Sequence, residues 1–128
     1  MKKESKRQQQ AAEVIRRNFS VVLQEIGSYV YGSEILVTVT HVKVTPDFGL
    51  AKIYLSIFNT ENKQAVLLLM EKEKYRFKSG LAARIRNKVR RMPNIDFYID
   101  ETLDEMYRIQ DLFNKLEEDN QMGKGDVE

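Results

Sequence analysis

The chain has 128 residues, 42% of them hydrophobic, which is enough for one domain with a single core. It contains no cysteine, which excludes disulfides, thiolate metal sites and cysteine nucleophiles. The N-terminus MKKESKRQQQ lacks the apolar run of a secretory signal, and no stretch approaches the about 18 apolar residues of a membrane span, so we expect a soluble cytoplasmic protein.

The N-terminal part is polar and basic before it becomes amphipathic. Residues 1–8 are expected to form a flexible basic arm, whose cations are Lys2, Lys3, Lys6 and Arg7. A first helix is predicted from about Gln8 to Ser28. Its apolar face holds Ile15, Phe19, Val22 and Ile26.

Two strands are predicted next, over Ile35–Thr45 and Leu50–Phe58, from β-branched residues and from alternation. The segment between them has turn chemistry, because Pro46 presets φ, Asp47 can bond to the nearby backbone and Gly49 tolerates positive φ. So short a connection indicates an antiparallel hairpin.

A second helix is predicted from about Lys63 to Lys74, and its apolar run Ala65–Met70 is expected to be largely buried. A third helix follows with little or no spacer. The chain direction is expected to change between Glu73 and Gly80.

The segment Lys74–Arg91 carries a concentrated positive charge. Its eight cations are Lys74, Arg76, Lys78, Arg84, Arg86, Lys88, Arg90 and Arg91, and it contains no acidic residue. The whole chain has 21 basic and 19 acidic residues, a net charge of +2, so the 13 basic residues outside the segment leave the remainder at −6.

A helix over this segment would be amphipathic. Its apolar stripe would be Phe77, Leu81, Ile85, Val89 and Met92. One row of cations would be Arg84, Lys88 and Arg91 at i, i+4, i+7, and a second would be Arg86 and Arg90 at i, i+4. Surface helices usually mix both signs of charge, and like charges at i, i+4 destabilise a helix by a few tenths of a kcal/mol per pair. The pattern therefore favours an anion-binding surface, nucleic acid ahead of membrane, over an ordinary solvated face.

Pro93 is expected to end the basic helix. A third strand, Asn94–Asp100, follows from clean alternation, and a capping box at Thr102 predicts a C-terminal helix. The apolar side of that helix would be Leu103, Met106, Ile109, Leu112, Phe113 and Leu116. Residues 117–128 are polar and expected to be a disordered tail.

These elements define an α+β fold with a three-stranded sheet and helices on one face. The order α-β-β-α-α-β, followed by an extra C-terminal helix, is that of a type II KH-like domain, here over residues 9–116. KH domains clamp the nucleic-acid backbone at a GXXG loop between two helices. This chain has no GXXG there, which argues against an ordinary KH domain that reads single-stranded bases.

Three segments, in this order, resemble the bacterial ribosome-binding factor A family. They are residues 39–47 (VTHVKVTPD), 51–56 (AKIYLS) and 84–103 (RIRNKVRRMPNIDFYIDETL), and the resemblance extends over about Gln10–Leu116. In that family an interrupted helix with an Ala-x-Gly pattern replaces the GXXG. Counting back without gaps places the pattern on Glu73-Lys74-Tyr75, which does not match, and Ser79-Gly80 is an alternative break.

The resemblance implies a non-catalytic assembly factor of the 30S ribosomal subunit. It implies binding to structured 16S rRNA late in maturation, support of 5′-end processing, a role in cold adaptation, and release aided by an assembly GTPase. The RNA contacts would then be made by the eight cations of residues 74–91 and by the basic arm.

Enzyme and metal roles find little support in the residues. His41 is the only histidine and is expected to be a partly exposed strand residue. Asp96 and Asp100 share a strand face and can bind a cation, but outward polar positions on an edge strand explain them better. Tyr54 and Tyr98 can stack on bases, although packing on the sheet is the simpler role. No catalytic residue, metal or cofactor is expected.

Two other function classes stay open on the residues alone. One is a general KH-type module for single-stranded RNA or DNA. The other is a protein-interaction module whose basic helix contacts an acidic partner. Nothing in the pattern indicates an obligate dimer, so a monomer is expected.

Overall fold

The computed structural model describes residues 4–102, 110 and 112–116. Its elements follow the order α1 (Lys6–Tyr31), β1 (Leu36–Val44), β2 (Leu50–Phe58), α2 (Lys63–Lys72), α3 (Lys74–Ile85) and β3 (Asn94–Ile99). This is the predicted α-β-β-α-α-β order of an α+β fold with a three-stranded sheet.

The sheet has the strand order β1-β2-β3, with β1 and β2 antiparallel and β2 and β3 parallel. The predicted hairpin is therefore confirmed. Thr40 is an extra residue in β1, because the register shifts between Val39 and His41. Such a bulge re-aims the side chains that follow it.

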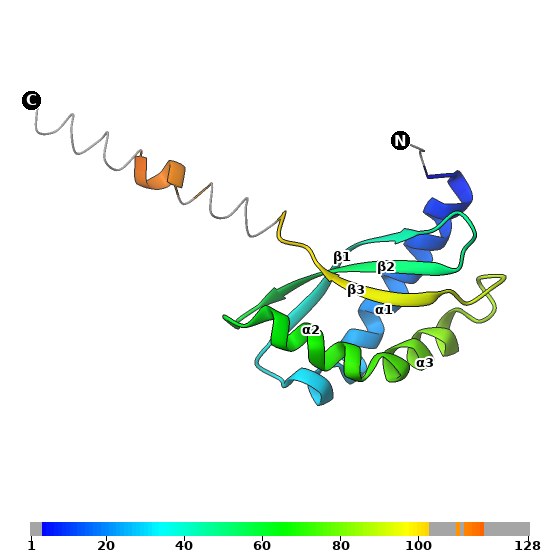
Figure 1. The fold of residues 1–128 in the computed structure, drawn as a ribbon, viewed down its shortest axis with the longest axis horizontal. Coiled ribbons are helices and arrows are strands. Elements are labelled where there is room, and N and C mark those ends of the chain that lie inside the picture. The colour runs from blue at the N-terminus through cyan, green and yellow to red at the C-terminus, as the bar shows by residue number, and fades with distance from the viewer. Residues whose placement is uncertain (1–3, 103–109, 111, 117–128) are drawn as a thin grey trace, which may run out of the picture.

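The three helices pack on one face of the sheet, since their buried residues and those of the strands form one core (Figure 1). Its centre is a cluster of three rings from α1, α3 and β3, Phe19, Phe77 and Phe97, with centroids 5.7–5.8 Å apart. Gly80 lies inside α3 against Val22 of α1, where an added Cβ would be 3.2 Å from Val22 Cγ1. None of the helices in the described part of the chain has the length and apolarity to cross a membrane.

Helix α1 begins at Lys6, earlier than predicted. Ser5 is its N-cap, and a capping box joins the Ser5 hydroxyl to the Gln8 amide while the Gln8 side chain accepts from the Ser5 amide. Gln8 Nε2 also donates to the carbonyl of Val44, 2.8 Å away, which fixes the start of α1 to the end of β1. The expectation of a flexible arm to residue 8 is therefore wrong for Lys6 and Arg7; Lys2 and Lys3 lie outside the described residues.

Helix α2 buries less than its sequence indicates. Only Val66 and Met70 are buried, while Leu68 and Leu69 are 63% and 42% exposed. A single helix on one side of a sheet buries one stripe at i, i+4. The expectation that the run Ala65–Met70 is largely buried is therefore wrong.

Most of the predicted C-terminal helix and the whole predicted tail, residues 117–128, lie outside the described residues. Thr102, Gln110 and residues 112–116 are helical. Leu112, Phe113 and Leu116 are exposed.

Candidate nucleic-acid interface

The basic segment is divided between a helix and a loop. Helix α3 ends at Ile85, and residues 86–93 form the connection to β3. The predicted continuous helix to Met92, with rows Arg84-Lys88-Arg91 and Arg86-Arg90, is wrong. The Asn94 amide donates to the Gly49 carbonyl, 2.9 Å away, so β3 must begin beside the hairpin turn. If α3 continued to Met92, its seven additional residues would extend the helix by about 10 Å, and the chain could not return to the hairpin turn at Asn94.

Three cations of α3 are bound within the chain. Lys74 Nζ donates to Asp96 Oδ1 at 2.8 Å, and Lys78 Nζ donates to Asn94 Oδ1 at 2.6 Å. Arg84 Nε donates to Asn18 Oδ1 at 3.2 Å, and Arg84 also lies 3.9 Å from Glu25. These side chains attach α3 to β3 and α1, so they are poor candidates for phosphate contacts.

The other cations of the segment face solvent. Arg76, Arg86, Lys88, Arg90 and Arg91 are exposed, and among the described residues their side chains make no hydrogen bond or ion pair. Four of the five lie in the loop 86–91. Positive charge without an internal counter-ion is available to an external anion.

The loop borders a hollow of about 780 Å³ between the N-terminal turns of α1, the hairpin turn 45–49 and Pro93. Its walls are apolar and are formed by Ala11, Val14, Ile15, Val44, Phe48, Val89 and Pro93. Its polar lining residues are Arg7, Gln10, Asp47, Lys88, Arg90 and Arg91. Four cations from two distant parts of the chain therefore meet at one concave surface, which we call the basic hollow.

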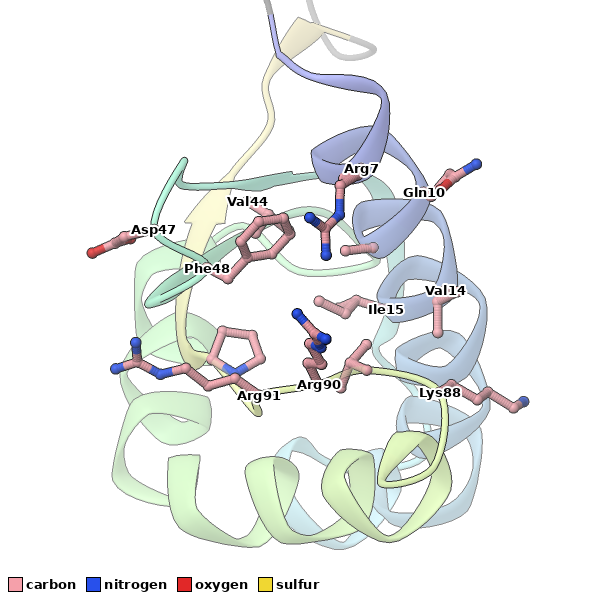
Figure 2. Close-up of a pocket in the computed structure, with 13 residues that line it drawn as sticks. Arg7, Gln10, Val14, Ile15, Val44, Asp47, Phe48, Lys88, Arg90 and Arg91 are labelled. Carbon is pink, nitrogen blue, oxygen red and sulfur yellow. The ribbon is translucent and has the colours of Figure 1, made fainter.

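Figure 2 shows how these cations are directed. The guanidinium groups of Arg7 and Arg90 point into the hollow and toward one another, whereas Lys88 and Arg91 extend outward on opposite sides. The structure thus brings Arg7 to the predicted cations Lys88, Arg90 and Arg91. It places Arg86 on the same loop and Lys74, Arg76, Lys78 and Arg84 on α3.

Asp47 is a carboxylate at this surface, but its hydrogen bonds stabilise the hairpin turn. Its Oδ1 accepts from the Thr45 hydroxyl at 2.7 Å and from the Gly49 amide at 2.9 Å. These bonds, in that order, hold the pKa of Asp47 below its ordinary value, with a smaller contribution from Arg91. The hollow therefore keeps a positive excess.

Phe48 lines the hollow, although the sequence did not indicate it as a site residue. It adopts the left-handed conformation with φ 59°, the role expected for Gly49, whose φ is not positive. A bulky residue with positive φ is unusual. Its ring covers one side of the hollow (Figure 2).

The break between α2 and α3 lies at Glu73, with φ −103° and ψ 21°. Counting back along the family pattern leads to this position, and the alternative break at Ser79-Gly80 does not occur, because both residues lie within α3. Glu71 and Glu73 are exposed beside the break. With the exposed Lys72 between them, these residues carry a net charge of −1 where a KH domain would hold phosphate with GXXG.

The remaining candidate residues have partners within the chain. Within residues 4–102, 110 and 112–116, no three Asp, Glu or His side chains come together to hold a metal ion. Asp96 is paired with Lys74, while Asp100 accepts from Thr40 at 2.6 Å and is only 10% exposed. Asp100 is thus a structural residue and not an outward polar position. His41 is partly exposed, as expected, and stacks on Tyr54, which stacks on Tyr98.

Known proteins share both sequence and fold with this chain. A family model described as "Ribosome-binding factor A" matches residues 7–113. Ribosome-binding factor A of Chloroherpeton thalassium is 33% identical over 113 residues, which are 88% of each chain. The crystal structure of ribosome-binding factor A from Thermus thermophilus superposes with a TM-score of 0.59 at 20% identity, covering 72% of this chain and 94% of that one. A homology model of the Thermus thermophilus protein fitted into a cryo-EM map of a 30S complex has a TM-score of 0.54 at 22% identity, covering 68% and 88%.

Proposed function

The chain belongs to the ribosome-binding factor A family, and from that premise we propose that it binds the 30S ribosomal subunit as a non-catalytic assembly factor. The contact is with structured 16S rRNA. The basic hollow and the loop 86–91 are the surface that meets it.

The observation that supports this proposal is the set of exposed cations without internal partners. Arg86, Lys88, Arg90 and Arg91 are held on one short loop, and Arg7 is held beside them by the capping box and by the bond from Gln8 to Val44. Phosphate contacts of this kind orient a protein on RNA and carry no sequence information by themselves. Specificity then comes from the shape of the immature subunit.

An assembly factor of this kind needs no chemical step. It binds one rRNA conformation more tightly than another and shifts the population by the difference in affinity. Late 30S maturation, 16S rRNA 5′-end processing and growth in the cold depend on that shift. An assembly GTPase that alters the bound rRNA conformation releases the protein, which acts as a cytoplasmic monomer.

The alternative of a general KH-type binder is disfavoured by the acidic residues at the α2–α3 break. A GXXG-type groove requires backbone amides open to phosphate at that point. Here Glu71 and Glu73 lie at that point, and four of the five exposed cations without internal partners lie in the loop beyond the other end of α3.

Cosedimentation with purified 30S, 50S and 70S particles at 50 and 200 mM salt tests the proposal. We expect preferential binding to 30S particles, weakened about 100- to 1,000-fold between the two salt concentrations if five or six phosphates are neutralised. An affinity for short single-stranded oligonucleotides equal to the affinity for 30S particles would favour the general KH-type module. Binding that survives nuclease treatment of the particles would favour a protein partner.

A further inference from the structure

The outer face of the sheet, opposite the helices, carries a row of three stacked rings. His41, Tyr54 and Tyr98 are register partners on β1, β2 and β3. The His41 and Tyr54 rings are 4.1 Å apart with an interplanar angle of 12°, and the Tyr54 and Tyr98 rings are 5.3 Å apart at 25°. We call these residues the aromatic row.

The aromatic row is open to solvent. The His41 side chain is 44% exposed and Tyr98 is 39% exposed, whereas Phe97, which points to the helices, is buried. β3 is an edge strand of the sheet, so within the described part of the chain no further strand covers the far side of Tyr98. Another flat ring can therefore extend the stack from Tyr98.

Positive charge lies beside the rings on the same face. Lys43 and Lys52 are cross-strand partners two residues along from His41 and Tyr54, a distance of about 7 Å. Asp96 completes this second row, but Lys74 neutralises it at 2.8 Å. At the His41 end of the row, Asp100 Oδ2 lies 3.3 Å from His41 Nδ1 and offsets one of these charges. The face thus combines an accessible aromatic surface with one positive charge in excess, located beside Tyr54 and Tyr98.

We propose that the aromatic row is a second RNA contact, which stacks an unpaired base of a single-stranded segment on Tyr98 while Lys43 and Lys52 bind its phosphates. Base stacking on aromatic side chains tolerates any sequence, because every base has a flat face. Bases inside a helix are already stacked on their neighbours, so duplex RNA is a poor ligand for this face. The contact is separate from the basic hollow, which adds phosphate contacts elsewhere on the molecule.

The single histidine makes this proposal accessible to NMR, because its imidazole gives one unambiguous set of signals. In a titration with a single-stranded octamer RNA, we expect ring-current shifts at Tyr98 and His41. The corresponding duplex, inorganic tripolyphosphate and a polyglutamate peptide should leave these signals in place. Absence of shifts with the octamer, or equal shifts with polyglutamate, overturns the proposal.

Affinity measurements give the second readout. Tyr98→Ala should weaken octamer binding about 5- to 150-fold, the equivalent of one lost stack. Tyr98→Phe should retain the affinity, and so should Tyr75→Ala, which removes a ring that is 83% exposed on α3. Equal affinity of Tyr98→Ala and the unaltered protein overturns the proposal.

The contact at the basic hollow and the contact at the aromatic row can be tested separately. Replacing Arg90 and Arg91 by Gln should weaken 30S binding and leave the octamer-induced shifts at Tyr98 and His41 in place. The variant can lose 30S binding while the octamer shifts the Tyr98 and His41 signals neither in the variant nor in the unaltered protein. That result would contradict the aromatic contact and leave the basic hollow supported.

Discussion

The hydroxyl of Thr40 donates a hydrogen bond to Oδ2 of Asp100, 2.6 Å away, across 60 residues of sequence. Thr40 is the bulge residue of β1, and Asp100 follows the last residue of β3, so the bond links the two outer strands past β2. The Asp100 amide also donates to the Leu55 carbonyl of β2 at 2.7 Å. The bulge therefore has a structural role, because it directs a hydroxyl toward a nearly buried carboxylate.

Replacing Thr40 by Val keeps the shape of the side chain but leaves Asp100 without its shortest hydrogen bond. A bond to a charged group contributes about 1.5–3 kcal/mol, so we predict a loss of that size in the free energy of unfolding. Urea denaturation measures it. Thr38→Val, at an exposed position on the same strand, is the matched control and should change stability by less than about 0.5 kcal/mol. Equal effects of the two substitutions would show that the bond contributes nothing.

Acid should destabilise the protein partly through Asp100. The hydrogen bonds from Thr40 and Thr102 lower the pKa of Asp100 from 3.8 to about 2. The folded state then binds fewer protons than the unfolded state in this range, so the stabilisation is complete above about pH 5 and is lost as the pH falls toward 2. Asp100→Asn should flatten the dependence of stability on pH between 5 and 2.

The remaining acid dependence in that variant should come from other carboxyls. Glu13, whose pKa is lowered to about 2 chiefly by hydrogen bonds from Arg16 and then Arg17, is unchanged by the substitution. Parallel stability curves for the variant and the unaltered protein would contradict the assignment to Asp100.

Phe48 offers a test of backbone strain beside the basic hollow. Phe48→Gly and Phe48→Ala both remove the ring, but only Gly accepts φ 59° without cost. We therefore predict that the Gly variant is more stable than the Ala variant by about 1–2 kcal/mol, although Gly is usually the more destabilising residue. Thermal or urea unfolding of the pair measures the difference. A more stable Ala variant would mean that residue 48 leaves the left-handed region in solution.

Gly80 should resist enlargement because α3 lies against α1 there. A Cβ at this position would be 3.2 Å from Val22 Cγ1, so the longer side chain of Gly80→Leu must push the helices apart. Overpacking of this kind costs about 1–3 kcal/mol. Ala83→Leu, at an exposed position on the same helix, should be close to neutral in urea unfolding. A neutral Gly80→Leu would show that the helices separate at little cost.

The strands were predictable from the sequence to within a residue, because alternation between a buried and an open face is a local signal. The start of α1 could also be predicted from a local signal, the spacing of Ser5 and Gln8 that forms the capping box. The end of α3 could not be predicted from a local signal. It depends on the bond from Asn94 to Gly49, which joins segments 45 residues apart, and periodicity of apolar residues continues past the true end of the helix.

The sequence was sufficient to predict the set of cations that contains those of the candidate site. It was not sufficient to predict which of them are exposed or how they are arranged in space. Composition identifies a segment with eight positive residues but gives no sign that Lys74, Lys78 and Arg84 are bound within the chain. Those pairings are long-range contacts with α1 and β3. Nor does the sequence show that Arg7 lies opposite Arg90, since that depends on how α1 is fixed to the end of β1.

The central claim is that the cations without internal partners bind the rRNA, whereas Lys74, Lys78 and Arg84 of α3 hold the fold. Two variants remove three positive charges each: Arg86, Arg90 and Arg91 to Gln in the loop, and Lys74, Lys78 and Arg84 to Gln in the helix. The unfolding curve of each variant shows whether it is folded at the assay temperature. The two sets change the net charge equally, and they differ in where the charge lies and in whether the side chains have partners within the chain.

The most direct measurement is the slope of log affinity for 30S subunits against log salt concentration, for the unaltered protein and both variants. Each lost phosphate contact reduces the magnitude of the slope by about 0.7–0.9. We predict a reduction of about 2 or more for the loop variant and less than about 1 for the helix variant. Equal reductions in both variants, or an unchanged slope for the loop variant, would contradict the account.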